Sequence, residues 1–312
     1  MPHRPAMLED ARLISAWACH AVERWQRLDA DGRAQDVPYD ALTIYERWLH
    51  GGAWMSLETG VLWLSHLLRG AGVTTVLEDE DGRAYGYLEA FAGDEPAPFG
   101  KHLYLAYTCL APDAPADGQD TLLQTALTLA QTHGGRLCVG ASAHDEARLA
   151  FLARYGMTQV QTLQRYTLTT ASGQGFYKAT EEHPTQATVI KGWAMPLGRL
   201  MSARATWEAE WVGVWDALPP IAQRRTHRVR CSASGHEAFL LFQVSLYNPR
   251  LADVSCWSQK PFSAPLVVAI RDWAQRNGYR ELRLWAEPNV AKAFGNELEA
   301  TPQQHVAFVR DV

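Results

Sequence analysis

An internal repeat is the feature that most constrains this chain. The segment Ala126–Gly134 (ALTLAQTHG) is echoed by Ile270–Gly278 (IRDWAQRNG), which shares its Ala-Gln pair and its terminal glycine. Each copy follows a Gly-centred hairpin signal and a β-like run that leads to a proline, and each precedes another β-like run. The 312 residues therefore predict two units of the same fold, since a chain of this length ordinarily divides into two cores.

Three helices are expected before the first strong strand signal. Apolar positions with helical spacing predict one helix over residues 8–28, and two more lie on either side of Gly51-Gly52. The last of these places four apolar side chains on one face, namely Leu57, Val61, Leu64 and Leu68.

The pattern then becomes β-like. Asp81-Gly82 predicts a hairpin between strands 73–77 and 84–91. The elements expected next are strand 102–110, a helix around 123–130, strand 137–140, helix 144–155 and strand 159–168. This order indicates a mixed sheet with helices on its faces, an α/β fold of the α+β, mixed-sheet kind.

The segment Thr169–His183 is rich in Thr, Ser, Gly and Glu and is the predicted linker between a unit at 1–170 and a unit at 184–312. A Trp-rich helix is expected at 200–217, ended by Pro219-Pro220. The second unit then predicts a hairpin from 228–233 and 237–246, strand 253–257, helix 264–277 and strand 281–286.

Four pieces of the first half carry a resemblance to a known family. They are Arg4-Pro5-Ala6 with Glu9-Asp10-Ala11, the Asp-Gly hairpin followed by Ala84-Tyr85-Gly86-Tyr87, Leu110-Ala111-Pro112 before a loop and helix, and His144–Met157 ending in Tyr155-Gly156-Met157. In this order they resemble the GNAT (GCN5-related N-acetyltransferase) superfamily over residues 3–168. The resemblance implies two tandem acyl-CoA N-acyltransferase-like domains, the second one degenerate.

The resemblance also implies a site for acetyl-CoA as co-substrate. In this family a gap between the fourth and fifth strands admits the pantetheine, and a helix N-terminus holds the pyrophosphate through its backbone amides. Carried over, the cofactor-binding residues are Thr108, Cys109 and Leu110 on the fourth strand, Ala116, Asp117, Gly118, Gln119, Asp120 and Thr121 in the loop and helix start, and Asp145.

The loop departs from the family pattern. Pro115 stands at the basic position, Gly118 is its one glycine, and Asp117 and Asp120 add negative charge. Each carboxylate would repel a pyrophosphate by roughly a kcal/mol at short range. Leu152 occupies the position of the family's general acid, a tyrosine.

Three residues are the catalytic candidates: Glu89, Tyr107 and Tyr155. Strand alternation predicts that Tyr104 and Tyr107 face opposite sides of the sheet, so that one of them looks into the acceptor cleft. Aromatic packing on a half-buried sheet, or in the helix for Tyr155, is the structural alternative.

The second half lacks a phosphate cradle, since Phe262-Ser263-Ala264 is all that separates Pro261 from the next helix, and Gly295 breaks its last helix. We interpret this half as structural or substrate-shaping. The stripe Trp207, Trp211, Trp215 fits core or interdomain packing, or the aromatic wall of an acceptor pocket.

Composition narrows the function classes. A net charge of −5 argues against non-specific nucleic-acid binding, and the basic strip from Arg224 to Arg230 is interpreted as a solvated loop that leads into a strand. No segment predicts a signal peptide, a membrane span or a metal site, and five dispersed cysteines suit a reducing, cytoplasmic setting.

Two functions remain open. One is an acyl-CoA-dependent N-acetyltransferase acting on a small amine-bearing substrate, with its site in the first half. The other is a catalytically degenerate GNAT-like ligand-binding or regulatory protein. A homodimer is compatible with either.

Overall fold

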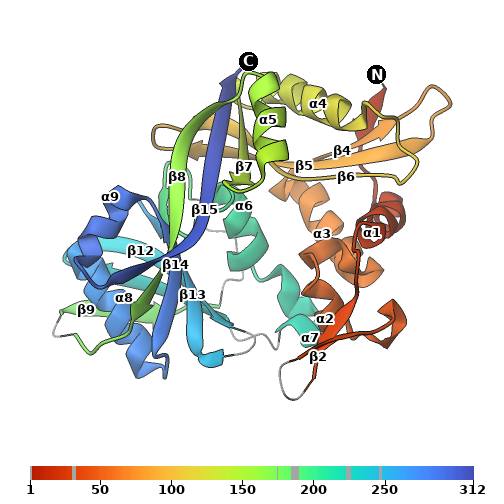
Figure 1. Cartoon of the computed structure of the whole chain (residues 1–312). Coiled ribbons are helices and arrows are strands. Elements are labelled where there is room, and N and C mark those ends of the chain that lie inside the picture. The colour runs from red at the N-terminus through yellow and green to blue at the C-terminus, as the bar shows by residue number, and fades with distance from the viewer. Residues whose placement is uncertain (1, 30–32, 174, 184–189, 223–225, 246–247) are drawn as a thin grey trace.

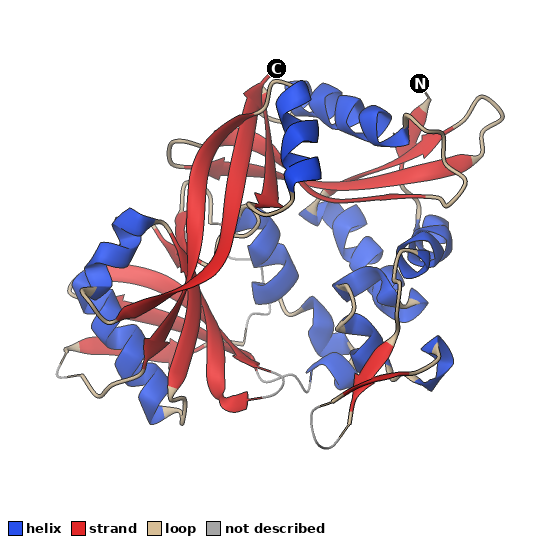
Figure 2. Cartoon of the chain, viewed as in Figure 1, coloured by secondary structure: helices blue, strands red, loops and turns tan. Residues whose placement is uncertain are grey.

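One curled sheet of thirteen strands runs through the part of the chain that the computed structural model describes, residues 2–29, 33–173, 175–183, 190–222, 226–245 and 248–312 (Figure 2). A separate hairpin pairs β2 (Gln26–Leu28) with β3 (Ala34–Asp36). The order in the large sheet is β1-β4-β5-β6-β7-β15-β8-β14-β10-β13-β12-β11-β9.

The first half builds one end of this sheet. Its strands there are β1 (His3–Pro5), β4 (Val73–Glu78), β5 (Ala84–Glu95), β6 (Gly100–Leu110), β7 (Arg136–Ser142) and β8 (Thr158–Thr169). Its helices are α1 (Ala11–His20), α2 (Ile44–Trp48), α3 (Leu57–His66), α4 (Gly118–Thr132) and α5 (Glu146–Arg154). The helices α4 and α5 lie on one face, and α1 to α3 lie on the other (Figure 1).

The second half builds the other end. Its strands are β9 (Tyr177–Glu181), β10 (Ala194–Leu197), β11 (Thr226–Ala233), β12 (His236–Ser245), β13 (Asn248–Ser258), β14 (Glu281–Ala286) and β15 (Leu298–Asp311). Its helices are α6 (Ala203–Thr206), α7 (Pro219–Ala222), α8 (Ala264–Arg276) and α9 (Pro288–Ala291). The order β11-β12-β13-α8-β14-α9-β15 repeats β4-β5-β6-α4-β7-α5-β8. The predicted duplication and mixed α/β fold are therefore confirmed.

The long strands β8 and β15 join the two halves (Figure 1). Residues 305–311 of β15 lie between β7 and β8 and pair antiparallel with β7. In the same way, residues 164–169 of β8 lie between β15 and β14 and pair antiparallel with β14. Each half thus lends a strand segment to the interior of the other half's sheet, and the sequence patterns did not predict β15.

Two helix predictions need correction. The helix predicted over 8–28 ends at His20, because residues 26–28 pair as a strand with residues 34–36. In α3 the buried face is centred on Gly60, Trp63 and Leu64, and it leaves Leu57 exposed. Gly60 lets this face pack closely on a tryptophan, since a Cβ on Gly60 would come 3.0 Å from the Trp54 ring.

The predicted linker and Trp-rich helix also differ from expectation. The linker contains β9, which pairs with β11. The Trp-rich segment is α6, the π-helical turn Trp207–Trp211 and the 3-10 turn Val214–Ala217, and Pro219 begins α7. Arg224 and Arg225 of the basic strip lie outside the described residues.

The three tryptophans of the stripe are buried, as the packing interpretation requires. Trp207 and Trp211 stack with ring centroids 4.6 Å apart, in a cluster that includes Trp257. Trp215 belongs to the core of the first half, where it stacks on Trp63 at 5.6 Å. The segment between the halves therefore ties two cores together.

The described residues also bear on the expectations about membranes and metals. No helix there combines the length and apolarity needed to cross a bilayer. No group of three or more His, Cys, Asp or Glu side chains gathers there as metal ligands do.

Candidate active site

The strands β6 and β7 diverge in the middle of the first half's sheet. They run parallel and pair at residues 103–105 and 137–139, and beyond these positions they separate. Side chains at 102–105 are buried, whereas those at 106–110 are half-buried. The diverging edge therefore carries the predicted backbone positions Thr108, Cys109 and Leu110.

A β-bulge at Ala106 precedes the divergence. Glu89 pairs with Tyr107 while the next residue, Ala90, pairs with Leu105, so Ala106 is the extra residue. The bulge reverses the alternation and places Tyr104 on the same face as Tyr107. The prediction that these two tyrosines face opposite sides is wrong, because strand alternation holds only without a bulge.

The equivalent divergence in the second half is closed. There β13 and β14 run parallel and pair only along residues 251–254 and 281–284. Strand β10 enters between their diverging ends, where Leu197 pairs with Cys256 of β13 and with Ala286 of β14. Of these two strand gaps, only the one in the first half is free of an inserted strand in the part of the chain that the structure describes.

Helix α4 begins beside the open gap. Gly118 is its first residue and is buried, and a Cβ there would come 3.0 Å from Leu110 Cδ2. The amides of Gly118 and Thr121 donate to the carbonyls of Pro115 and Asp117, at 2.9 Å each. The first-turn amides of a helix lack internal partners, which makes this end of α4 suited to an anion.

The carboxylate of Asp120 is partly neutralised by α5. The Tyr155 hydroxyl donates to Asp120 Oδ1 at 2.5 Å, and the Arg154 guanidinium lies 3.6 Å from the same oxygen. Burial and the Asp120 carboxylate raise the pKa of Tyr155. Tyr155 therefore lies at the start of α4 with its proton engaged there, whereas Asp117 is exposed.

Two other positions of α5 have clear structural roles. Asp145 is the N-cap residue, and its Oδ1 accepts from the Arg148 amide at 3.0 Å. Leu152, at the position of the family's acid, is fully buried and offers no proton.

Glu89 lies buried on β5, where it contacts α3 and the turn before α3. Its carboxylate accepts from the indole N–H groups of Trp54 and Trp63, the latter at 3.0 Å, and from the Tyr87 hydroxyl at 3.2 Å. Burial raises the pKa of Glu89 to about 7, although the three donors lower it. The carboxyl can therefore take up or release a proton near neutral pH.

Tyr107 and Cys109 share the face of Glu89 and stand on the half-buried part of β6. Burial raises the pKa of Cys109 to about 12 and also raises the pKa of Tyr107, with the nearby Glu89 carboxylate adding to both. Both groups are thus neutral at physiological pH, and neither is a ready nucleophile.

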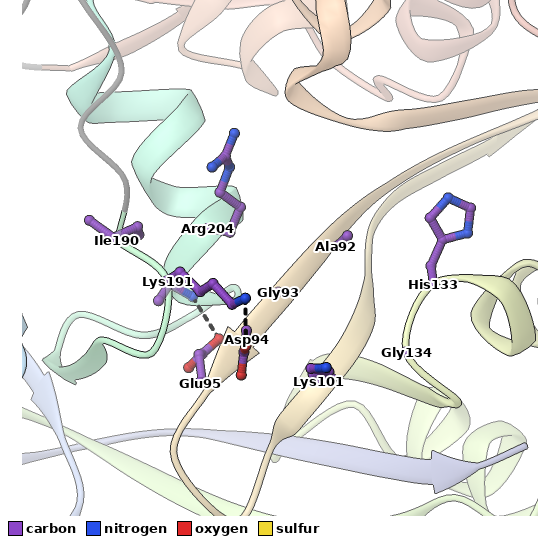
Figure 3. A pocket seen from close by; sticks show the side chains of 11 residues that line it. Ala92, Gly93, Asp94, Glu95, Lys101, His133, Gly134, Ile190, Lys191 and Arg204 are labelled. Atoms are coloured by element: carbon purple, nitrogen blue, oxygen red, sulfur yellow. Dashed lines mark hydrogen bonds and ion pairs between the residues drawn. The ribbon is translucent and has the colours of Figure 1, made fainter.

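A cavity of about 410 Å³ opens between the β5–β6 hairpin, the end of α4 and the segment that precedes α6 (Figure 3). In its lining Lys191 lies 3.9 Å from Asp94, and Glu95 accepts from the Ala203 amide at 3.0 Å. The described residues that line it include none of the predicted site residues. A shallower depression of about 370 Å³ contains Asp117, Asp120 and Thr121.

No family model and no curated protein matches this sequence. Solved structures match its fold. A GCN5-related N-acetyltransferase from Anabaena variabilis superposes with a TM-score of 0.61 at 10% identity, covering 99% of this chain and 72% of that one. The chain has the GNAT fold. A probable N-acyltransferase from Enterococcus faecalis gives a TM-score of 0.53 at 10% identity and covers 100% and 72% of the two chains.

In the terms of the GNAT fold, β6 and β7 are the fourth and fifth strands of the first half, and α4 follows the loop expected to hold the pyrophosphate. The structure brings Leu110 next to Gly118 and places Glu89, Tyr107 and Cys109 on the opposite face of the sheet. Sequence reasoning missed Trp54 and Trp63 as partners of Glu89. The available signal was a pair of tryptophans, each with an N–H group that needs an acceptor when buried, in the helical region that precedes the strand of Glu89.

Proposed function

We propose that this chain is an acyl-CoA-dependent N-acetyltransferase that acts on a small amine, with its site in the first half. The observation that carries the proposal is the open divergence of β6 and β7 behind the bulge at Ala106. In the GNAT family the equivalent gap admits the pantetheine arm of the acyl-CoA. The second half has the same divergence but fills it with β10.

The residues around the gap fit an acyl-CoA substrate. The backbone of Thr108, Cys109 and Leu110 would line the pantetheine, because the edge of β6 that faces β7 has no strand partner there among the described residues. The amides of Gln119 and Asp120 would receive the pyrophosphate at the start of α4. The contacts of Tyr155 and Arg154 with Asp120 reduce the repulsion that its carboxylate would exert.

Acetyl transfer needs a neutral amine and a route for its proton. Glu89 lies on the face of the sheet that such a route would use, and its pKa of about 7 suits proton exchange at neutral pH. Tyr107, opposite Glu89 on the bulged strand, is the neutral hydroxyl between that buried carboxyl and the edge of the gap. Since the Tyr155 proton is engaged by Asp120, we assign proton transfer to the face of Glu89 and Tyr107.

The alternative is a GNAT-like protein that binds a ligand without catalysis. Two observations favour it: Leu152 replaces the acid and is fully buried, and the loop before α4 carries Asp117 and Asp120 with a single glycine. The two proposals differ in one respect, namely whether bound acetyl-CoA is turned over in the presence of amines.

Isothermal titration calorimetry with acetyl-CoA up to millimolar concentration tests the proposal. We expect binding by the native chain and its loss in Gly118→Pro. Proline is tolerated at the first position of a helix, but here it removes the amide that donates to Pro115 and forces Asp117 out of its local conformation. The matched control is Ala264→Pro at the first residue of α8, the equivalent helix of the second half, where the preceding Ser263 is already extended. This control should leave binding unchanged.

No binding by the native chain would refute the enzyme proposal. Unchanged binding by Gly118→Pro would refute the placement of the site. Binding without acetyl transfer to any of a set of primary amines would favour the ligand-binding alternative.

A further inference from the structure

His305 reaches the candidate site from the last strand of the chain. It lies on β15, paired with Ser142 of β7 on one side and with Leu163 of β8 on the other. This part of β15 is the segment that the second half lends to the sheet of the first half. His305 therefore belongs to the second half in sequence but lies in the sheet of the first half.

Three polar atoms converge above Gly140. A Cβ on this glycine would come 2.6 Å from His305 Nε2, 2.8 Å from the Tyr104 hydroxyl and 2.9 Å from the Leu200 carbonyl oxygen. Gly140 is the first residue of β7 beyond its pairing with β6. The three atoms thus meet where the gap opens, on the face that Tyr104 shares with Tyr107 and Glu89, and any side chain at 140 would displace them.

The imidazole of His305 has an unused nitrogen. Its Nε2 is buried and, among the described residues, has no hydrogen-bond partner, while the Tyr104 hydroxyl donates to the Leu200 carbonyl at 3.2 Å. A buried polar atom without a partner lowers the stability of the fold, so its retention calls for an explanation.

The surroundings keep this imidazole neutral. Burial lowers the pKa of His305, and the Arg199 guanidinium lowers it further, although the Leu200 carbonyl opposes both. The titratable and charged groups that face it from the packed elements are Tyr104 on β6 and Arg199 in the segment before α6. A neutral imidazole with a free ring nitrogen can accept a proton.

We propose that His305 accepts the proton of the substrate amine. The inference rests on the proposed function. As the amine nitrogen bonds to the thioester carbon, the carbon–sulfur bond breaks and one amine proton passes to Nε2. The departing thiolate then takes this proton from the imidazolium and becomes the thiol, which returns His305 to its neutral form.

The test uses the full chain in two variants, His305→Gln and a matched control, His20→Gln, at an exposed position on α1. Calorimetry with acetyl-CoA separates binding from chemistry. NMR of histidine-labelled protein, with His305 assigned from His305→Gln, reports whether acetyl-CoA reaches the ring. Acetyl transfer to a diamine, an amino sugar and an amino-acid amide is then followed from pH 5.5 to 9.5.

We expect His305→Gln to bind acetyl-CoA as the native chain does and to lose about 100-fold or more in kcat, with the acidic limb of its pH profile gone. Acetyl-CoA should move the His305 signal more than the His20 signal. Bound acetyl-CoA that leaves the His305 signal unchanged, or a His305→Gln rate close to the native one, would overturn this inference alone. Absence of acetyl-CoA binding by the native chain would overturn the proposed function and this inference with it.

Discussion

Burial of Glu89 makes the stability of this protein fall as the pH rises. The pKa of this carboxyl is about 7 in the folded chain, against an ordinary value of 4.5. Between these values the unfolded chain has lost the proton that the folded chain still holds, so unfolding releases a proton and is favoured by higher pH. The difference of about 2.5 pH units corresponds to about 3 kcal/mol at 1.36 kcal/mol per unit.

The perturbation is Glu89→Gln, which removes the charge and keeps the shape. The amide NH2 that takes the place of Oε2 cannot accept from the Trp63 indole, so we expect a loss of about 1–3 kcal/mol at pH 5. By pH 8 this difference in unfolding free energy should disappear. The native chain is then destabilised by an ionised carboxylate in its core, whereas the variant buries no charge.

Urea unfolding at pH 5, 6, 7 and 8 measures this effect, with Glu80→Gln in the exposed β4–β5 turn as the control. The unfolding free energies of the native chain and of Glu89→Gln should converge or cross as the pH rises. Parallel curves for these two proteins over the whole range would refute the reasoning, since the carboxyl would then be ionised in both states.

Three further outcomes follow from the contacts of the first half. Trp63→Phe removes a donor that lowers the pKa of Glu89, so the pH at which stability declines should move upward in the same urea series. Arg199→Ala leaves the buried Glu95 carboxylate without its two guanidinium hydrogen bonds of 2.8 and 3.2 Å, and calorimetric unfolding should show a loss of about 3–5 kcal/mol. Asp120→Asn removes one negative charge near the start of α4, and the Kd for acetyl-CoA measured by titration should fall roughly fivefold, or about 1 kcal/mol.

Local patterns predicted most of the elements well. Strand 281–286 has the predicted bounds, and the hairpin turns at Asp81-Gly82 and Ser234-Gly235 lie where the glycines indicated. Alternation and turn residues act within a few positions of each other, so these elements can be read from short windows of sequence.

Features that depend on contacts between residues far apart in the sequence could not be predicted from such short windows. Strand β10 exists because the diverging ends of β13 and β14 offer it two edges, and nothing within Ala194–Leu197 indicates that those edges are open. The bulge at Ala106 has no glycine to mark it. His305 acquires its position over Gly140 only when β15 enters the other half's sheet.

The strand exchange explains how a half without an open gap can still serve the site. Residues 305–311 fill the position between β7 and β8, so the first half by itself would expose two unpaired interior strand edges. We expect residues 1–170 expressed alone to self-associate and to bind no acetyl-CoA. A separate peptide of residues 298–312 should restore part of the monomeric state and part of the acetyl-CoA binding. Light scattering and calorimetry measure these outcomes. A monomeric 1–170 that unfolds cooperatively and binds acetyl-CoA like the whole chain would show instead that the second half contributes nothing to the site.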